Sequence, residues 1–213
     1  VKKYPLSRIA KIYRCCPVVI LDKMRKYKIP RRSISEASTR HLKTNFNGDL
    51  TEKAYLIGFR LGDLRVRKGH NLIEIGCGTT KPKQVQLIKN LFSEYGPFWI
   101  TKKDKRGAFH IDCSLNSSFR FLLPKHNSIP KWILRNKKNF FAFLAGYTDA
   151  EGNIGFCDGR AKFRIRSYDK EILRNIDDRL HKLDIKSLFR LDQKSGIDQR
   201  SIFRRKDSWA LIV

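Results

Sequence analysis

Apolar residues recur at helical spacing in the first part of the chain. Between residues 5 and 34 they lie three or four positions apart, as Leu6 and Ile9 do, and again Leu21 and Met24. This period places such residues on one side of a helix. We expect two or three short helices here, forming a small all-α unit of the helix-turn-helix kind.

From residue 51 onward, helical and strand-like periods alternate, and the same order occurs twice. The first series predicts a helix at 54–62, strands at 64–66 and 71–77, a helix at 85–92, strands at 98–101 and 108–113, and a short helix at 117–123. The second series predicts a helix at 140–150, strands at 153–157 and 161–166, a helix at 171–183, and strands at 188–191 and 208–213. No counterpart of the short helix follows, so the second series is either truncated or does without it.

An internal repeat accounts for this order. Asp63 and Glu151 end the two apolar helices 88 residues apart, and the helix that starts near Gln84 recurs at the same offset. Two copies of one unit indicate a repeated architecture. We therefore predict an α+β protein in which two pseudo-symmetric αββαββ repeats form a saddle, preceded by the small all-α helix-turn-helix unit.

The segments between these units are polar and basic. Residues 30–48 are rich in Arg, Ser, Thr and Asn, and residues 124–139 contain Pro124, Pro130 and several lysines. We predict five segments: a helix-turn-helix-like module at 1–35, a basic linker at 36–50, a first repeat at 51–127, a second linker at 128–139 and a second repeat at 140–213.

The charge balance changes the picture of what the chain binds. It has 46 Lys and Arg against 20 Asp and Glu, a formal net charge of +26. Such an excess repels itself unless a polyanion neutralises it, so nucleic acid is the expected partner. No apolar run approaches the roughly 20 residues that span a bilayer, so we expect no membrane association.

The cysteines and the start of the chain bear on location. The five cysteines never occur as C-x-x-C, which indicates neither a disulfide framework nor a zinc ribbon. The first residues lack the apolar core of a secretion signal. We expect an intracellular protein, in the cytoplasm or an organelle matrix, that is not secreted.

The two apolar helices share a pattern of small residues and acids. They read LIGFRLGD at 56–63 and LAGYTDAEG at 144–152. Gly58 and Gly62 are four residues apart, as are Gly146 and Ala150, so the two helix backbones can approach closely. The acids that end the helices would then lie near each other. Repulsion between them would be offset by a divalent cation, and oxygen ligands suit Mg²⁺.

One such helix alone is as often a buried core helix as a site, but two copies in a basic chain favour chemistry. The pair of motifs resembles the LAGLIDADG homing endonuclease family, in its two-motif, single-chain form. The resemblance implies Asp63 and Glu151 as catalytic, metal-binding residues, with Gly62 and Ala150 in the metal site. It implies a monomer that cuts both strands of a long double-stranded DNA target. Arg60 and Leu64 depart from the pattern, where an apolar residue and a glycine are usual.

The same resemblance assigns the strands that follow each motif to the DNA surface. The implied contacts in the repeats are Arg65, Arg67, Lys68, Glu74, Arg160, Lys162, Arg164 and Arg166. The N-terminal segment separately resembles the small helix-turn-helix modules often attached to homing nucleases, and its candidate DNA contacts are Lys23, Lys26, Arg31 and Arg32. We favour phosphate contacts over base reading for most of them. Weak candidates for ordering water at the metal are Lys103, Lys125, Gln193 and Lys194.

Two other functions fit the charge. A group I intron maturase would use the same fold to bind intron RNA without cutting, and a transcription regulator would bind DNA without cutting. The presence of both Asp63 and Glu151 favours cleavage over either.

Overall fold

The computed structural model describes residues 4–31, 41–70, 72–101, 103–157, 159–197 and 203–213, and the chain divides into two compact units, 1–42 and 43–213. In the first unit, α1 (Leu6–Ile12) packs against α2 (Pro17–Lys26), with Ala10 buried. The turn between them includes Arg14 in a left-handed conformation, with a φ of 49°. Two of the predicted short helices are therefore present among the described residues.

The second unit contains a helix and strand series followed by another of closely similar order. The first series is α4 (Leu50–Gly62), β1 (Arg65–Lys68), β2 (Ile73–Thr79), α5 (Pro82–Phe92), β3 (Phe98–Ile100), β4 (Phe109–Leu115) and the 3-10 helix η1 (Ser117–Leu122). The second is α6 (Lys131–Arg135), α7 (Lys137–Glu151), β5 (Gly152–Cys157), β6 (Arg160–Ser167), α8 (Lys170–His181), β7 (Leu188–Gln193), β8 (Gly196–Ile197), β9 (Phe203–Arg204) and β10 (Ser208–Ile212).

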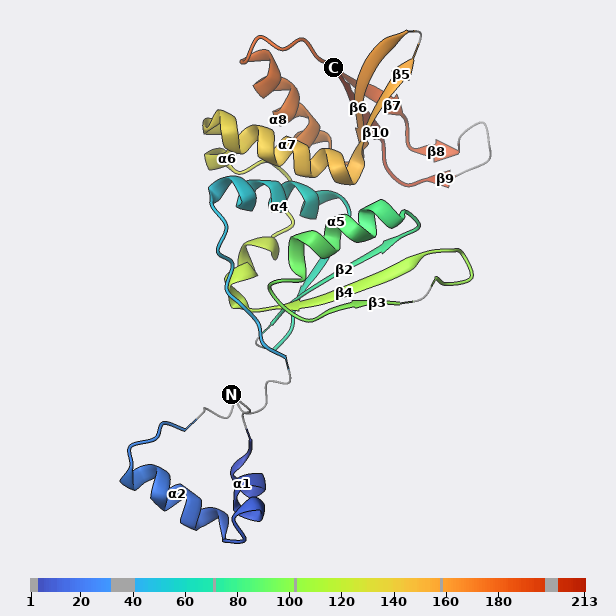
Figure 1. Ribbon diagram of the computed structural model, residues 1–213. Helices are drawn as coiled ribbons and strands as arrows, with labels where there is room; N and C mark the ends of the chain where they lie inside the picture. The colour runs from blue at the N-terminus through green and yellow to red at the C-terminus, as the bar shows by residue number, and fades with distance from the viewer. Residues whose placement is uncertain (1–3, 32–40, 71, 102, 158, 198–202) are drawn as a thin grey trace. The chain divides into compact units, whose positions relative to one another are not determined.

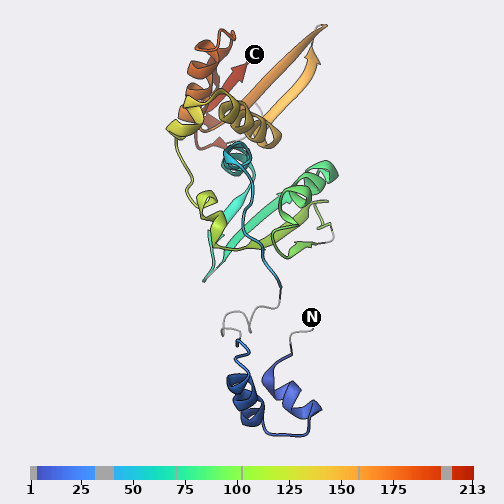
Figure 2. The same ribbon diagram turned by 60° about the vertical axis from the view of Figure 1, so that its left-hand side comes forward.

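Each series builds a four-stranded antiparallel sheet. The strand orders are β1-β2-β4-β3 and β5-β6-β10-β7, and β8 and β9 form a separate small hairpin. Helices α4 and α7 lie against each other between the two sheets (Figures 1 and 2). The predicted α+β class is confirmed, and the strand pairings in both sheets are antiparallel. The described residues contain no helix long and apolar enough to cross a membrane.

The structure differs from the sequence analysis at two places: one predicted segment and one feature that was not predicted. The segment at 128–139 is not only a linker, because it contains α6 and the start of α7, and Ile133 is buried in the core. Ile129 and Ile133 are the buried apolar residues of this stretch, and two such positions are too few to establish a period. The β8–β9 hairpin was also not predicted, since each of its strands is two residues long.

Local side chains fix where α4 and α7 begin. Asp49 caps α4, accepting from the backbone nitrogens of Thr51 and Glu52, while Glu52 bonds back to the nitrogen of Asp49. Asn136 caps α7 by accepting from the nitrogen of Asn139. Such caps satisfy donors that have no partner inside the helix.

Glycines allow α4 and α7 to cross closely. A Cβ at Gly58 would lie 2.2 Å from the carbonyl oxygen of Phe143, and one at Gly146 would lie 2.1 Å from that of Tyr55. Both are backbone contacts that cannot yield, so only glycine fits at these positions. The close approach predicted from the spacing of small residues is confirmed. Separate apolar cores lie on either side of the crossing, one under each sheet.

Candidate active site

The C-terminal ends of α4 and α7 adjoin each other and carry one acid each. A Cβ at Gly62 would lie 2.4 Å from the Cβ of Ala150 and 3.0 Å from the Cγ of Glu151. Asp63 is the C-cap of α4, and Glu151 is the last residue of α7. Both side chains are half-buried, and the charge of Asp63 raises the pKa of Glu151. The fold therefore brings the two acids into one site.

The carboxylate of Asp63 is held by residues from α5 and the end of β2. Gln84 donates its Nε2 to Oδ2 of Asp63, and the Oε1 of Gln84 accepts from the hydroxyl of Thr79 at 2.5 Å. Burial raises the pKa of Asp63, while the Gln84 hydrogen bond and the charge of Lys81 oppose this. The net shift is upward because burial is the largest effect.

The surroundings of Glu151 are more acidic. Burial raises its pKa most, the charges of Asp63 and Asp169 raise it further, and Lys125 acts in the opposite direction. Lys81, which acts on Asp63, and Asp169, which acts on Glu151, occupy equivalent positions at the offset of 88 residues. At this position Asp63 therefore has a lysine as its neighbour, whereas Glu151 has an acid. The two carboxylates are therefore electrostatically unequal.

The donors at this site suit a hard divalent cation. Among the described residues, no group of three or more His, Cys, Asp or Glu is arranged so that it could hold a metal ion by itself. The two carboxylates stand at negative helix ends, where carbonyls such as those of Gly62 and Ala150 lack partners inside the helix. Mg²⁺ is commonly bound by one or two carboxylates, with water and phosphate as its other ligands. Asp63, Glu151 and these carbonyl oxygens fit that donor set.

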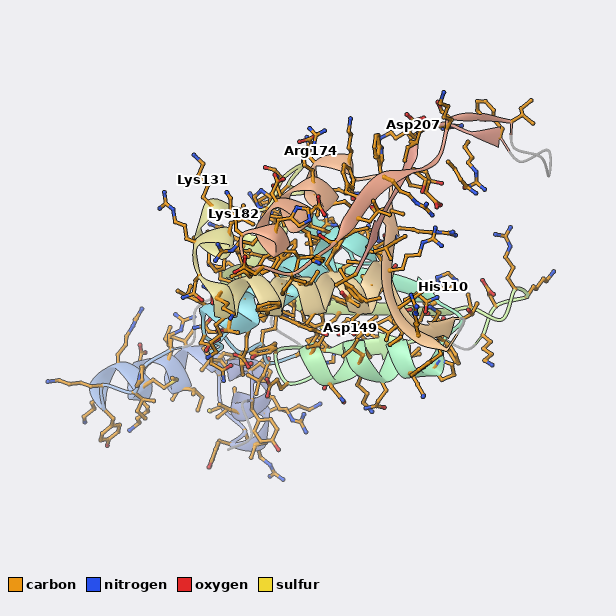
Figure 3. All side chains as sticks on the ribbon, turned by 90° about the horizontal axis from the view of Figure 1, so that it is seen from above. His110, Lys131, Asp149, Arg174, Lys182 and Asp207 are labelled. Atoms are coloured by element: carbon orange, nitrogen blue, oxygen red, sulfur yellow. The ribbon has the colours of Figure 1, made fainter. Side chains whose placement is uncertain are left out.

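Asp149, labelled in Figure 3, is not one of the two acids, Asp63 and Glu151, that form this site. It lies on α7 two residues before Glu151 and accepts a hydrogen bond from the hydroxyl of Tyr55 on α4 at 2.6 Å. It therefore links the two helices through a side-chain hydrogen bond.

The four weak candidates have separate surroundings. Lys125 is among the charges that act on Glu151. Lys103 lies over the ring of Phe109, the charge of Lys194 acts on Asp207, and Gln193 pairs with Ser208 in the sheet. Of the four, Lys125 is the one that the charge interactions connect with the acids.

The outer face of the first sheet carries part of the predicted DNA contacts. Arg65 and Arg67 alternate on β1 and pair with Asp112 and Glu74, the former at 3.2 Å. Lys68 is exposed, but its register partner is Ile73, which is buried in the core. Alternation therefore places Lys68 on the opposite side from the two arginines, which corrects its assignment to the same surface.

The second sheet presents a longer row of cations. The register pairs Arg160, Lys162 and Arg164 with Cys157, Gly155 and Asn153, and Arg166 with Ala210, so the four cations alternate along one face of β6. Arg190 of β7 faces Ala210 from the other side. In the N-terminal unit, Lys23, Lys26 and Arg31 are exposed, and Arg32 lies outside the described residues.

Comparison with solved structures gives the fold. The crystal structure of I-DmoI in complex with DNA and Mn has a TM-score of 0.52 at 20% identity, covering 77% of this chain and 90% of that chain. The N-terminal LAGLIDADG domain of DUF199/WhiA has a TM-score of 0.52 at 16% identity, covering 87% of both chains. The chain has the LAGLIDADG fold.

Sequence comparison adds little beyond this fold. No family model matches the sequence. The uncharacterized protein MJ0398 of Methanocaldococcus jannaschii is 24% identical over 167 residues, which are 74% of this chain. The chain spans 59% of the length of that protein.

The sequence did not reveal several members of the site. Gln84, Lys81 and Asp169 lie beside the acids, and Asp112 and Asp192 lie among the sheet cations. None belongs to a motif, because their positions depend on how α5, α8 and the sheets pack against α4 and α7. The offset of 88 residues was the available signal for the pair Lys81 and Asp169.

Proposed function

We propose that this chain is a site-specific, metal-dependent homing endonuclease that makes a double-strand break in a long DNA target. The observation that carries the proposal is the pair of half-buried acids, Asp63 and Glu151, at the adjoining ends of α4 and α7. The homing endonuclease I-DmoI, which has this fold, has been solved with DNA and Mn and with DNA and Ca, and one of its variants has been solved with its target DNA in the presence of Mg.

In this proposal each acid serves one strand. Asp63 and Glu151, with the carbonyl oxygens of Gly62 and Ala150, would hold divalent cations such as Mg²⁺. When bound, the cations supply Lewis acidity that activates water and stabilises charge on the leaving oxygen.

The surrounding residues orient the acids and offset charge. Gln84 fixes the direction of the Asp63 carboxylate by donating to Oδ2, and Thr79 in turn fixes Gln84. Lys81 and Lys125 place positive charge beside Asp63 and Glu151, where negative charge would develop on the phosphate. We expect the lysines to affect rate and Gln84 to affect metal affinity.

The sheets and the N-terminal unit supply the DNA interface. We propose that two pseudo-symmetric repeats each cover half of the target, with cations on the outer sheet faces and with Lys23, Lys26 and Arg31 on the flanking backbone. Most of these contacts are expected to meet phosphate. Because both acids belong to one chain, a monomer is sufficient for cutting both strands.

The test begins with duplexes selected from a randomised library by binding to the intact chain. The selected DNA is incubated with Mg²⁺ and the wild-type chain, the double variant Asp63→Asn with Glu151→Gln, or the control Asp149→Asn. Asp149 is an exposed acid on the same helix, and asparagine there can still accept from Tyr55. We expect double-strand cutting by the wild type and the control, none by the double variant, and none in EDTA. A double variant that cuts like wild type would exclude the acids from catalysis.

A further inference from the structure

Asp192 on β7 holds two arginines of β6 on the outer face of the second sheet. Arg164 donates its Nη2 to Oδ1 of Asp192, and the Nε of Arg166 lies 3.2 Å from Oδ2. Each carboxylate oxygen thus takes one guanidinium. The side chain of Asp192 is only 9% exposed, whereas those of Arg164 and Arg166 are 31% and 54% exposed. The acid lies beneath the two cations, which face outward.

The strand between them permits this contact. In the sheet, β10 separates β6 from β7. Ala210 of β10 pairs with Arg166 on one side and Arg190 on the other, so a small side chain lies where the arginines must pass to reach Asp192. The pairing of β10 with β7 also shifts register between Ser208 and Trp209, beside Asp192. A bulge of this kind re-aims nearby side chains.

The cluster changes what the two arginines can do. Alternate residues of one strand are about 7 Å apart, so two guanidiniums there repel each other. A nearly buried carboxylate between them offsets the repulsion and fixes both, leaving one net positive charge. An arginine that contacts only phosphate does not need a fixed direction. A guanidinium fixed in direction suits the paired acceptors on the edge of guanine.

The first sheet provides a contrast within the same chain. Its arginines each have their own acid, and Arg65 and Asp112 are 67% and 53% exposed. A pair so exposed is screened by solvent and holds its geometry weakly. The two sheets therefore differ in how firmly they present their arginines.

We propose that Asp192 is a positioning residue that fixes Arg164 and Arg166 for reading base edges. The second sheet then discriminates guanine-containing base pairs more strongly than the first. This inference rests on the proposed function, because it requires that the outer sheet faces contact duplex DNA.

The test compares sequence preference with overall affinity. Duplexes from a randomised library are selected without divalent cations by the wild type and by Asp192→Asn. The variant is expected to lose about tenfold in preference at the base pairs beneath β6, the scale of one bidentate arginine contact. Its affinity for an unrelated duplex is expected to be equal or higher, with a steeper salt dependence, because a negative charge has been removed. A merely structural role would instead lower affinity for both duplexes.

Two further variants make the result decisive. Asp112→Asn is the matched control on the first sheet, and its effect is expected to be smaller and confined to other base pairs. Arg166→Lys keeps the charge at an exposed position and is used if Asp192→Asn does not fold; it is expected to lose the same preference. Unchanged preference in the folded variants overturns the inference while leaving the nuclease proposal intact. A wild-type chain that enriches no sequence and binds no duplex overturns both.

Discussion

Nη1 of Arg60 donates to the carbonyl oxygen of Leu64 at 2.6 Å, across the turn that contains Asp63. Nε of the same buried guanidinium donates to the carbonyl oxygen of Leu122 at 3.1 Å. One side chain therefore ties the end of α4 both to the residue after Asp63 and to η1. Arg60 and Leu64 are the two departures from the LAGLIDADG pattern in the first repeat, and they are in contact. We infer that the arginine stabilises a turn that lacks the usual glycine.

Replacement of Arg60 tests this coupling. Arg60→Met leaves two carbonyl oxygens without these donors, and we expect a loss of about 2 kcal/mol in unfolding free energy, measured by urea denaturation. Cleavage of the strand that depends on Asp63 is expected to fall more than cleavage of the other strand. Equal loss on both strands would show that Arg60 supports the fold without aiming Asp63.

The close crossing of α4 and α7 predicts that one added methyl group at the crossing lowers the free energy of unfolding strongly. In Gly146→Ala the new Cβ would meet the carbonyl oxygen of Tyr55, so the helices must separate, and we expect a loss of about 3 kcal/mol or more. Gly155→Ala on β5 is the control, since the nearest atom to its Cβ would be 3.8 Å away. It is expected to change stability by no more than about 0.5 kcal/mol. Similar thermal unfolding of the two variants would refute the close crossing.

The hydrogen bond from Gln84 to Asp63 predicts that replacing Gln84 shifts the pH profile of cleavage. Its hydrogen bond lowers the pKa of Asp63, so Gln84→Met should raise that pKa further. Because the ionised carboxylate binds the metal, the acid limb of cleavage should move to higher pH, and more Mg²⁺ should be needed at a fixed pH. Lys83→Met, at an exposed position on the same helix, serves as the control. If the acid limb does not shift in Gln84→Met, Gln84 does not act on cleavage through the pKa of Asp63.

The raised pKa of Glu151 predicts that the acid destabilises the protein when no metal is bound. A carboxyl with a raised folded pKa binds more protons in the folded than in the unfolded state, so its contribution to stability falls as pH rises through that interval. Glu151→Gln removes this effect. Its melting temperature relative to wild type should therefore increase as pH rises from acid to neutral in EDTA. A constant difference across this range would contradict the upward shift.

Local signals were enough to predict the motif helices. The apolar period and the following acids were visible for α4 and α7, and the offset of 88 residues showed that Asp63 and Glu151 are equivalent. Small residues at Gly58 and Gly146 then implied a close crossing. These features are encoded within a few turns of helix, where sequence spacing and spatial proximity coincide.

Features that depend on packing were not predictable in this way. The burial of Ile133 in α6 depends on the core beneath the second sheet, not on a period in its own segment. The pairing of Asp192 with Arg164 depends on strand order and on a bulge that leaves Asp192 of β7 without a register partner on β10. Sequence identified the cations of β6 but not the acid that orients them, since β6 and β7 are separated by a strand in space and by α8 in the chain.

Strand-resolved cleavage by the two single variants tests the central claim most directly. A selected duplex, labelled separately on each strand, is incubated with Mg²⁺ and with the wild type, Asp63→Asn or Glu151→Gln. Two acids that each serve one strand predict cutting of both strands by the wild type and a loss of at least about a hundredfold on one strand in each variant, with opposite strands affected. If the wild type cuts neither strand while binding structured intron RNA tightly, the nuclease account is wrong and a maturase takes its place.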